Sequence, residues 1–110
     1  MRQASKVDAN QAEIVKALRQ AGATVQPLHA VGQGCPDLLV GWRGMNILIE
    51  VKDGSKSPSR QKLTPDQCEW MSMWTGQVEV ANTVDGAIDI LERHSKWLIG
   101  MSILPEEMRR

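Results

Sequence analysis

Apolar residues at helical spacing mark the first ordered segment of the chain. Ile14 and Leu18 lie four positions apart and share one face with the alanine three positions further on. Asp8 or Asn10 can cap the start of the segment, and a glutamine or glutamate three positions after each completes a capping box. A glycine follows as a typical helix stop. The pattern predicts an amphipathic helix over residues 8–21.

Three short apolar runs come next and predict three strands, at residues 24–31, 37–42 and 46–52. Pro27 lies inside the first run and cannot donate a ladder hydrogen bond, which favours an edge position or a bulge. Only three residues, one of them glycine, join the second run to the third, as in a β-hairpin. Both of these runs are rich in Leu, Ile and Val, which is typical of strands buried on two faces.

A polar loop over residues 54–63 carries three cations and no acid, and a second helix follows it. Thr64 is a typical N-cap, a proline occupies the first helical position after it, and Gln67 can complete a capping box. We expect this helix to end before the glycine at position 76 and to bury Cys68 and Met71 on its inner face.

The last part of the chain predicts one more strand and one more helix. Residues 78–81 form the strand, and a helix capped at Thr83 or at the asparagine before it extends to about His94. The apolar segment 97–103 is compatible with a final strand or with an extended packing segment. The resulting order, αβββαβα, predicts one α/β domain over residues 1–110, with a small mixed central sheet flanked by helices.

Charge and composition narrow the possible functions. Thirteen Lys and Arg balance thirteen Asp and Glu, so binding of nucleic acid through a general positive field is disfavoured and any such contact must be local. No apolar run approaches the length of a bilayer span and the first residues lack a secretory signal, so we expect a cytoplasmic protein with no membrane partner. Cys35 and Cys68 are far apart, which favours free thiols and disfavours a zinc site with His29 and His94.

Three charged residues stand where the apolar runs begin and end. Asp37 opens the second predicted strand, and Glu50 and Lys52 close the third. Glu50 and Lys52 are two positions apart, so their side chains point to the same face. Asp37 and Glu50 are thirteen positions apart, which suits two paired strands and a turn. We therefore expect the three side chains to converge at one end of the sheet.

This convergence has a chemical and an ordinary interpretation. Two carboxylates held close together repel each other unless a cation joins them, and hard oxygen ligands suit Mg²⁺ or Mn²⁺ better than zinc. A cation at Asp37 and Glu50 can polarise a phosphodiester, while Lys52 orients water or stabilises the charge that develops. The alternative is a common Glu–Lys pair at a solvated strand end, which the spacing alone favours.

The order of the motifs resembles a nuclease family. Pro36-Asp37 followed by Glu50-Val51-Lys52 resembles the PD-(D/E)xK nuclease motif. The wider pattern is similar to the VRR-NUC family of virus-type replication-repair nucleases, in particular to its compact stand-alone members in phages. It comprises NQAEIVKALRQAGA at residues 10–23, GCPDLLV at 34–40, IEVK at 49–52 and LTPDQCEW at 63–70. The match spans residues 10–81.

The resemblance implies a restriction-endonuclease-like core and a Mg²⁺- or Mn²⁺-dependent DNA endonuclease, with four-way (Holliday) junctions as the favoured substrate. Carried over position by position, it implies catalytic roles for five side chains: Glu13, Asp37, Glu50, Lys52 and Gln67. Asp37, Glu50 and the main-chain carbonyl of Val51 would hold the metal, with Glu13 directly or through water. From the residues alone, Glu13 and Gln67 can equally be helix-capping side chains.

The remaining expectations concern partners. Lys56, Arg60 and Lys62 stand just before the Gln67 helix, which favours contacts with DNA phosphates. A four-way junction has approximate two-fold symmetry, so we expect a homodimer. Trp70, Trp74 and Trp97 are the candidate anchors of its interface, and His29 is expected near the mouth of the site.

Two rival functions stay open. One is a flap or fork nickase on the same fold. The other is a catalytically silent DNA-binding module that kept the fold. The complete set of Asp37, Glu50 and Lys52 argues against the silent module, because a protein that only binds DNA gains nothing from two acids facing a phosphate.

Overall fold

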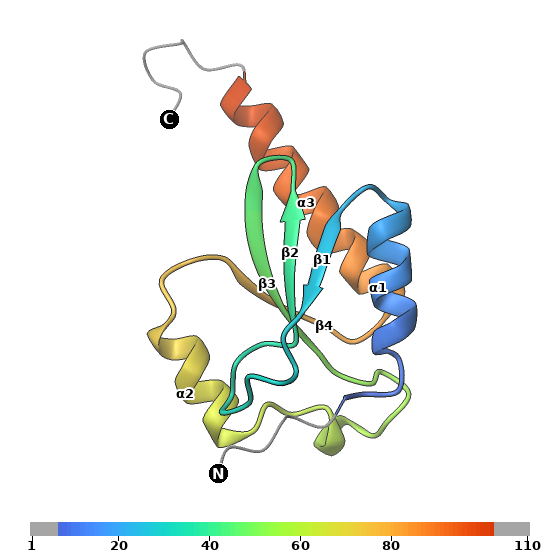
Figure 1. Ribbon diagram of the computed structural model, residues 1–110, viewed down its shortest axis with the longest axis vertical. Coiled ribbons are helices and arrows are strands. Elements are labelled where there is room, and N and C mark those ends of the chain that lie inside the picture. The colour runs from blue at the N-terminus through green and yellow to red at the C-terminus, as the bar shows by residue number, and fades with distance from the viewer. Residues whose placement is uncertain (1–6, 103–110) are drawn as a thin grey trace.

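The computed structural model describes the main chain of residues 7–102 and the side chains of residues 7–95. Three helices, four strands and one short 3-10 helix follow one another along the chain (Figure 1). In order they are α1 (Gln11–Gln20), β1 (Thr24–Pro27), β2 (Leu38–Trp42), β3 (Met45–Val51), η1 (Pro58–Arg60), α2 (Pro65–Met73), β4 (Val78–Ala81) and α3 (Val84–Ser102). The expected α/β class with a small mixed sheet is confirmed.

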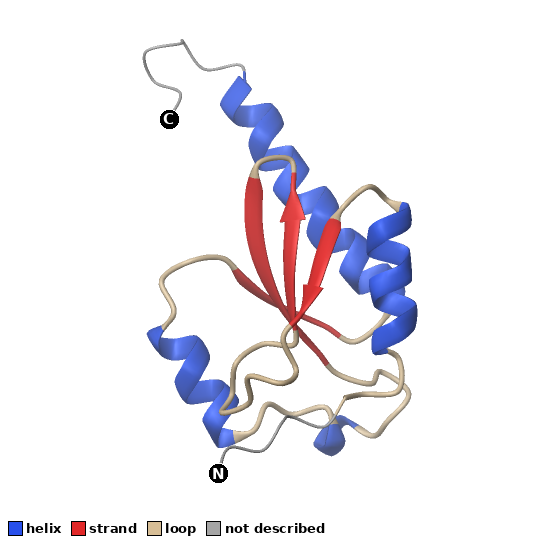
Figure 2. Ribbon diagram, in the orientation of Figure 1, coloured by secondary structure: helices blue, strands red, loops and turns tan. Residues whose placement is uncertain are grey.

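The sheet has the strand order β1-β2-β3-β4. β1, β2 and β3 pair antiparallel, and β4 joins β3 in parallel (Figure 2). β1 is an edge strand, which tolerates Pro27 because one side of the strand makes no ladder bonds. The predicted hairpin is also confirmed: Arg43 and Gly44 connect β2 to β3, both with positive φ, as a tight turn between antiparallel strands requires.

Helices α1 and α3 lie side by side and cover one face of the sheet (Figure 1). Ile14 and Leu18 of α1 meet Ile90 of α3 and the inward side chains of β2 and β3 in one core cluster. Alternation along β3 then turns Glu50 to the opposite face, away from this cluster. That second face carries an exposed Leu39, so it is not covered by α1 or α3.

The start of α1 differs from the sequence-based expectation. The helix begins at Gln11, and the side chain of Asn10 makes no capping hydrogen bond. Instead Asn10 Nδ2 donates to the main-chain oxygens of Lys52 at 3.0 Å and Asn82 at 3.1 Å. The predicted capping boxes at Asp8 and Asn10 are therefore wrong, because the asparagine ties the helix to the ends of β3 and β4.

Helix α2 stands apart from the core, at the end of the sheet (Figure 1). None of its residues is buried, and Cys68 is exposed, so the predicted inner face with Cys68 and Met71 is wrong. Its start is as predicted, with a complete capping box between Thr64 and Gln67. The first turn of the helix packs against the loop at Gly34, and no side chain of the helix is buried in the core.

Helix α3 is longer than the sequence suggested. Thr83 Oγ1 accepts a hydrogen bond from Gly86 N at 2.9 Å, which confirms the predicted cap. The helix then continues to Ser102, so the predicted strand or extended segment over 97–103 is wrong as far as residue 102. Trp42 Nε1 donates to Ser95 Oγ at 3.0 Å and anchors α3 past the expected end. The Trp97 side chain and residue 103 lie outside the described part.

Candidate active site

The pairing of β2 with β3 brings the two acids of the motif together. Leu38 pairs with Ile49, so the next pair in this register is Asp37 and Glu50. Asp37 Oδ2 accepts a hydrogen bond from the main-chain N–H of Val51 at 2.8 Å, which fixes its carboxyl at the end of the ladder. Asp37, Glu50 and Lys52 are 5%, 2% and 8% exposed. The expected convergence of these three side chains is present.

Gln67 connects Glu50 to Lys52. Its Nε2 donates to Glu50 Oε2 at 3.0 Å, and its Oε1 accepts from Lys52 Nζ at 2.7 Å. The same Oε1 accepts from Thr64 N at 2.9 Å, and Gln67 N donates to Thr64 Oγ1 at 3.2 Å. Gln67 therefore both caps the helix and contacts Glu50 and Lys52. The capping box orients the amide that bridges the acid and the base.

The electrostatics of the pair are unfavourable without a cation. Burial and the neighbouring carboxylate of Asp37 raise the pKa of Glu50 to about 8, although Lys52 Nζ lies 3.6 Å from Glu50 Oε2. Burial also raises the pKa of Asp37, with Asp8 adding repulsion and the Val51 N–H opposing it. Glu50 Oε1 is buried and receives no hydrogen bond. Near neutral pH the arrangement therefore favours a proton on Glu50, or a metal cation between the two carboxylates.

The donor set fits a hard divalent cation. Mg²⁺ is commonly held by one or two carboxylates, with water and substrate phosphates completing its shell. Within residues 7–95, no group of three or more His, Cys, Asp or Glu side chains surrounds a common point, as a zinc site would need. Cys35 lies near the pair, but burial and the charges of Asp37 and Glu50 raise the pKa of its thiol, so it remains protonated.

Glu13 is not gathered with the other candidates. It is exposed and faces a separate hollow together with Asn10 and Asp53. The reason is helical geometry, since Glu13 lies two positions after Gln11, or about 200° further around the helix. Gln11 is the buried polar residue of α1, because it lies three positions before Ile14 and seven before Leu18, on the face that packs into the core. The catalytic role that the resemblance implies for Glu13 therefore stays a prediction.

The basic loop is held firmly beside the site. Gln61 Nε2 donates to the main-chain oxygen of Lys56 at 2.6 Å, and Asn82 Nδ2 donates to Gln61 Oε1 at 2.9 Å. Lys56 Nζ is 3.7 Å from Asp8 Oδ1, so part of its charge is already balanced. Arg60 and Lys62 are exposed. The sequence indicated the cations of this loop but not the two amides that fix its shape.

Gly34 positions α2 over the site, which sequence reasoning missed. Its φ is +84°, and a Cβ at this position would collide with the main-chain carbonyl of Asp66 in the first turn of α2. The preceding residues Gly32 and Gln33 also have positive φ, which brings the loop close to the helix. This close approach fixes the position of the first turn of α2, and so of Gln67, whose side chain binds Glu50. In the sequence, only the two glycines on either side of Gln33 indicated an unusual backbone before Asp37.

Gly34→Ala is expected to destabilise the fold more than Gly44→Ala. Both glycines have nearly the same φ, +84° and +83°, so both variants bear the cost of a left-handed alanine, about 1–2 kcal/mol. Nothing lies within 4 Å of a Cβ at Gly44, whereas Gly34→Ala must also displace α2, at a further ~1–3 kcal/mol. Urea unfolding of the two variants measures the difference. Equal losses of stability would show that the approach of the loop to α2 is not tight.

Comparison of the chain with family models, with curated proteins and with solved structures gives no match in any of the three. The functional argument therefore depends on the arrangement of side chains around Asp37 and Glu50 and on the motifs that contain them. In the part of the chain that the structure describes, no helix combines the length and the apolar character needed to cross a membrane.

Proposed function

We propose that the chain is a Mg²⁺- or Mn²⁺-dependent DNA endonuclease with a restriction-endonuclease-like core, which cuts branched DNA and favours four-way junctions. The observation that carries the proposal is the pair of buried carboxyls of Asp37 and Glu50, which lie together at the end of a hairpin with Lys52 beside them. A purely structural role gives no reason to bury two acids whose pKa values are both raised by the arrangement.

The two carboxylates and the Val51 carbonyl would hold the cation. When bound, such a cation polarises the phosphodiester and lowers the pKa of a bound water. The contribution of the chain is to keep Asp37 and Glu50 in place before the substrate arrives. The hydrogen bond from Val51 N fixes one carboxyl, and the amide of Gln67 fixes the other.

Lys52 supplies the positive charge that the reaction needs next to the acids. Its ammonium is held 2.7 Å from Gln67 Oε1, which leaves further N–H donors for a water or a phosphoryl oxygen. In the hydrolysis, the oxygen of water bonds to phosphorus and the bond from phosphorus to one sugar oxygen breaks. The leaving sugar oxygen takes up a proton. Lys52 stabilises the negative charge on the phosphoryl oxygens during this step.

A panel of labelled substrates tests the proposal and separates it from its rivals. Duplex, flap, fork and four-way junction DNA are incubated with the protein in Mg²⁺, and single-turnover rates are compared. We expect the junction to be cut fastest. A flap or fork cut faster than the junction identifies a nickase of that structure, and binding of all four without cleavage identifies a silent DNA-binding module.

The basic loop is expected to bind DNA phosphates. Replacing Lys56, Arg60 and Lys62 together by alanine should weaken DNA binding and reduce the slope of log K against log salt by about 0.9 for each phosphate that the loop no longer neutralises. Fluorescence anisotropy at several salt concentrations in EDTA measures this without cleavage. Arg43→Ala is the matched control, because Arg43 is exposed in the turn between β2 and β3, remote from Glu50. A slope unchanged by the triple replacement would remove the loop from the interface.

We also propose that the protein acts as a homodimer, which places two sites on one symmetric junction. The exposed apolar side chains at the end of α2 support this, since Met73 is 78% and Trp74 45% exposed and Trp74 stacks on Trp70 with ring centroids 4.7 Å apart. Light scattering should then give twice the chain mass of 12.2 kDa. A mass of one chain, free and on DNA, would contradict the dimer.

The proposed compartment is the cytoplasm of a bacterial or phage-infected cell. Both cysteines of the chain, Cys35 and Cys68, are free thiols in the structure. Free thiols suit a reducing compartment, where DNA is also found.

A further inference from the structure

The two edges of the sheet, β1 and β4, differ in how well they are closed. An open edge offers unpaired N–H and C=O groups to any further strand, so folded proteins commonly block it. At the end of β1, the N–H of Leu28 donates to the main-chain oxygen of Asp37. Because bonded and unbonded positions alternate along antiparallel strands, the main-chain groups of Val25 and Pro27 face outward.

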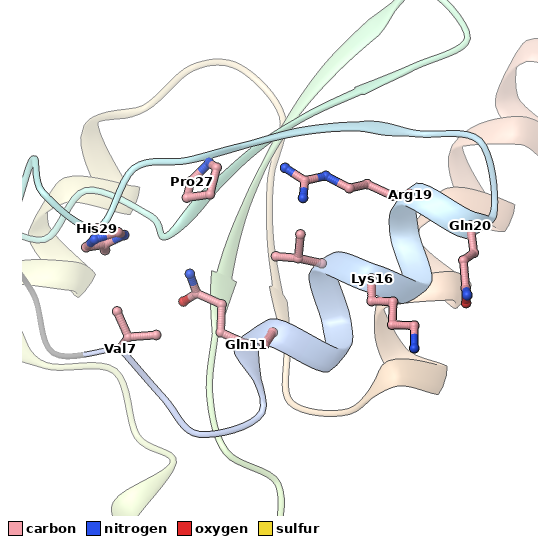
Figure 3. A pocket seen from close by; sticks show the side chains of 9 residues that line it. Val7, Gln11, Lys16, Arg19, Gln20, Pro27 and His29 are labelled. Carbon is pink, nitrogen blue, oxygen red and sulfur yellow. The ribbon is translucent and has the colours of Figure 1, made fainter.

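The β1 edge is blocked at most of its outward groups. Arg19 Nη2 donates to the main-chain oxygen of Val25 at 3.0 Å, and Figure 3 shows Arg19 reaching from α1 toward this strand. Pro27, labelled on the same strand, has no N–H to offer. Its oxygen accepts from Gln26 Nε2 at 3.3 Å. A further strand would therefore find little to bond to here.

The β4 edge is open. Lys52 N donates to the main-chain oxygen of Ala81 at 2.9 Å, so residues 79 and 81 bond to β3 and the N–H and C=O groups of Val78 and Val80 face outward. No hydrogen bond from the rest of the described chain reaches these outward groups. Val80 is 46% exposed, and neither valine is a charge or a proline that would keep another strand away. This edge is ready to extend the sheet.

A second copy of β4, running antiparallel, matches the open edge. If Glu79 of one copy lies opposite Glu79 of the other, Val78 pairs with Val80 of the other copy, and every outward N–H meets an outward oxygen. A register centred on Val80 would instead need Asn82, whose oxygen already accepts from Gly54 N at 2.9 Å. The register centred on Glu79 is therefore the one that satisfies the edge.

The side chains at this centre suit the pairing. Two glutamates would meet there, and like charges on opposite strands repel each other. Each Glu79 carboxylate, however, accepts from Arg93 of its own chain at 3.2 and 3.3 Å and lies 3.3 Å from His94 Nε2. The guanidinium of Arg93 has five N–H donors, so it can also serve the Glu79 of the other copy. The pairing thus joins two Glu–Arg pairs that are already neutralised.

The open edge is continuous with the exposed end of α2. In Figure 1 the loop after α2 leads directly into β4. The ring of Trp74 lies against Gly76, two residues before Val78, since a Cβ at Gly76 would come within 2.9 Å of Trp74 Nε1. Trp74 is exposed, and its ring therefore adds apolar surface beside the first residue of the open edge.

We propose that two copies of the chain pair through β4, antiparallel and centred on Glu79, which joins two sheets into one. Paired residues of antiparallel strands share a face, so both Glu50 side chains lie on the same side of the joined sheet. Glu50 pairs with Val80, which puts the two Glu50 Cα atoms three strand spacings and two residues apart, or about 16 Å. Both carboxyl pairs can then contact one DNA molecule. That use rests on the proposed function, whereas the strand pairing is a property of the free protein.

Cysteine cross-linking tests the register. Glu79→Cys in a Cys68→Ser background, which removes the exposed native thiol, places two thiols at the centre, where facing Cα atoms are about 4.5 Å apart. A disulfide spans Cα distances of about 4.4–6.8 Å, so oxidised glutathione should convert this variant to a covalent dimer on a non-reducing gel. Val80→Cys in the same background is the matched control. Its two Cα atoms would be about 8 Å apart, too far for a disulfide.

Val80→Pro tests the main-chain bonds. The N–H of Val80 faces outward, so proline removes no bond to β3, whereas the dimer loses one hydrogen bond from each copy. We expect the dissociation constant of the dimer to rise about 10-fold or more. Val80→Thr keeps both the N–H and the β-branched shape and should dimerise like the unmodified protein. Analytical ultracentrifugation without DNA compares the three proteins.

The inference is overturned if Glu79→Cys does not cross-link, if Val80→Cys cross-links as readily, or if Val80→Pro and Val80→Thr dimerise equally well. A dimer mass without a cross-link at residue 79 removes β4 from the interface but leaves the homodimer. A monomer that cuts junction DNA leaves the nuclease proposal and removes the strand pairing. Cross-linking at residue 79 without DNA cleavage in Mg²⁺ or Mn²⁺ leaves the strand pairing and removes the nuclease proposal.

Discussion

Asp37→Asn is expected to abolish metal-dependent cleavage while the fold and DNA binding persist. Asparagine has the same shape, and its side-chain oxygen can still accept the hydrogen bond from Val51 N. The negative charge that would hold the cation is removed, and with it the activation of water. We expect single-turnover cleavage to fall by about 10³-fold or more, which is at or above the effect of removing one hydrogen-bond donor to the transition state.

The matched control is Asp89→Asn on α3. Asp89 is exposed and pairs only with Arg93 among the described ion pairs, so the same chemical change there should leave cleavage unaltered. DNA binding in EDTA should be equal for both variants. If Asp37→Asn cuts at the rate of the unmodified protein, Asp37 is not part of the active site.

Glu50→Gln is expected to stop cleavage and, at the same time, to stabilise the cation-free protein at alkaline pH. The pKa of Glu50 is raised from 4.5 to about 8 on folding. A raised pKa means that the folded state favours the protonated form, so stability is full below pH 4.5 and is lost as the pH rises toward 8. Glutamine cannot ionise and avoids this loss. We expect a gain of about 2 kcal/mol at pH 9, less than the full pKa difference implies because solvent screens part of the charge.

Urea unfolding in EDTA at pH 5 and pH 9 measures this effect. The free energy of unfolding should fall with pH in the unmodified protein and should change much less in Glu50→Gln. Glu69→Gln on the exposed face of α2 is the control and should keep the original pH dependence. Added Mg²⁺ should stabilise the unmodified protein by mass action but not the Glu50→Gln variant. Identical pH dependence in the two proteins would mean that folding does not raise the pKa of Glu50.

The convergence at the site was accessible from the sequence because its causes are local. Alternation along one strand puts Glu50 and Lys52 on one face, and the short link to the preceding strand sets the register that places Asp37 opposite Glu50. The capping box between Thr64 and Gln67 was also accessible, since it depends on four consecutive residues, whereas the place of Gln67 at the site was implied only by the family resemblance. Each of these features follows from spacing within one hairpin or one helical turn.

The features that the sequence did not reveal depend on contacts between distant segments. The side chain of Asn10 binds main-chain oxygens 42 and 72 positions away and makes no capping hydrogen bond, so α1 begins at Gln11. The apolar segment 97–103 was predicted as a strand or an extended packing segment, because a short apolar run has no period that would indicate the helix. Gly34 has a positive φ, and the approach of α2 adds a second requirement for glycine that no local pattern shows.

The most direct test of the nuclease site is an order-of-addition experiment on a labelled four-way junction. The complex is formed in EDTA with protein in excess, and Mg²⁺ is then added beyond the chelator while the products are followed on a denaturing gel. The expected result is no product before the addition and rapid cleavage after it. Cleavage at the same rate in EDTA, or no cleavage after either Mg²⁺ or Mn²⁺, would contradict a cation-dependent nuclease built on Asp37 and Glu50.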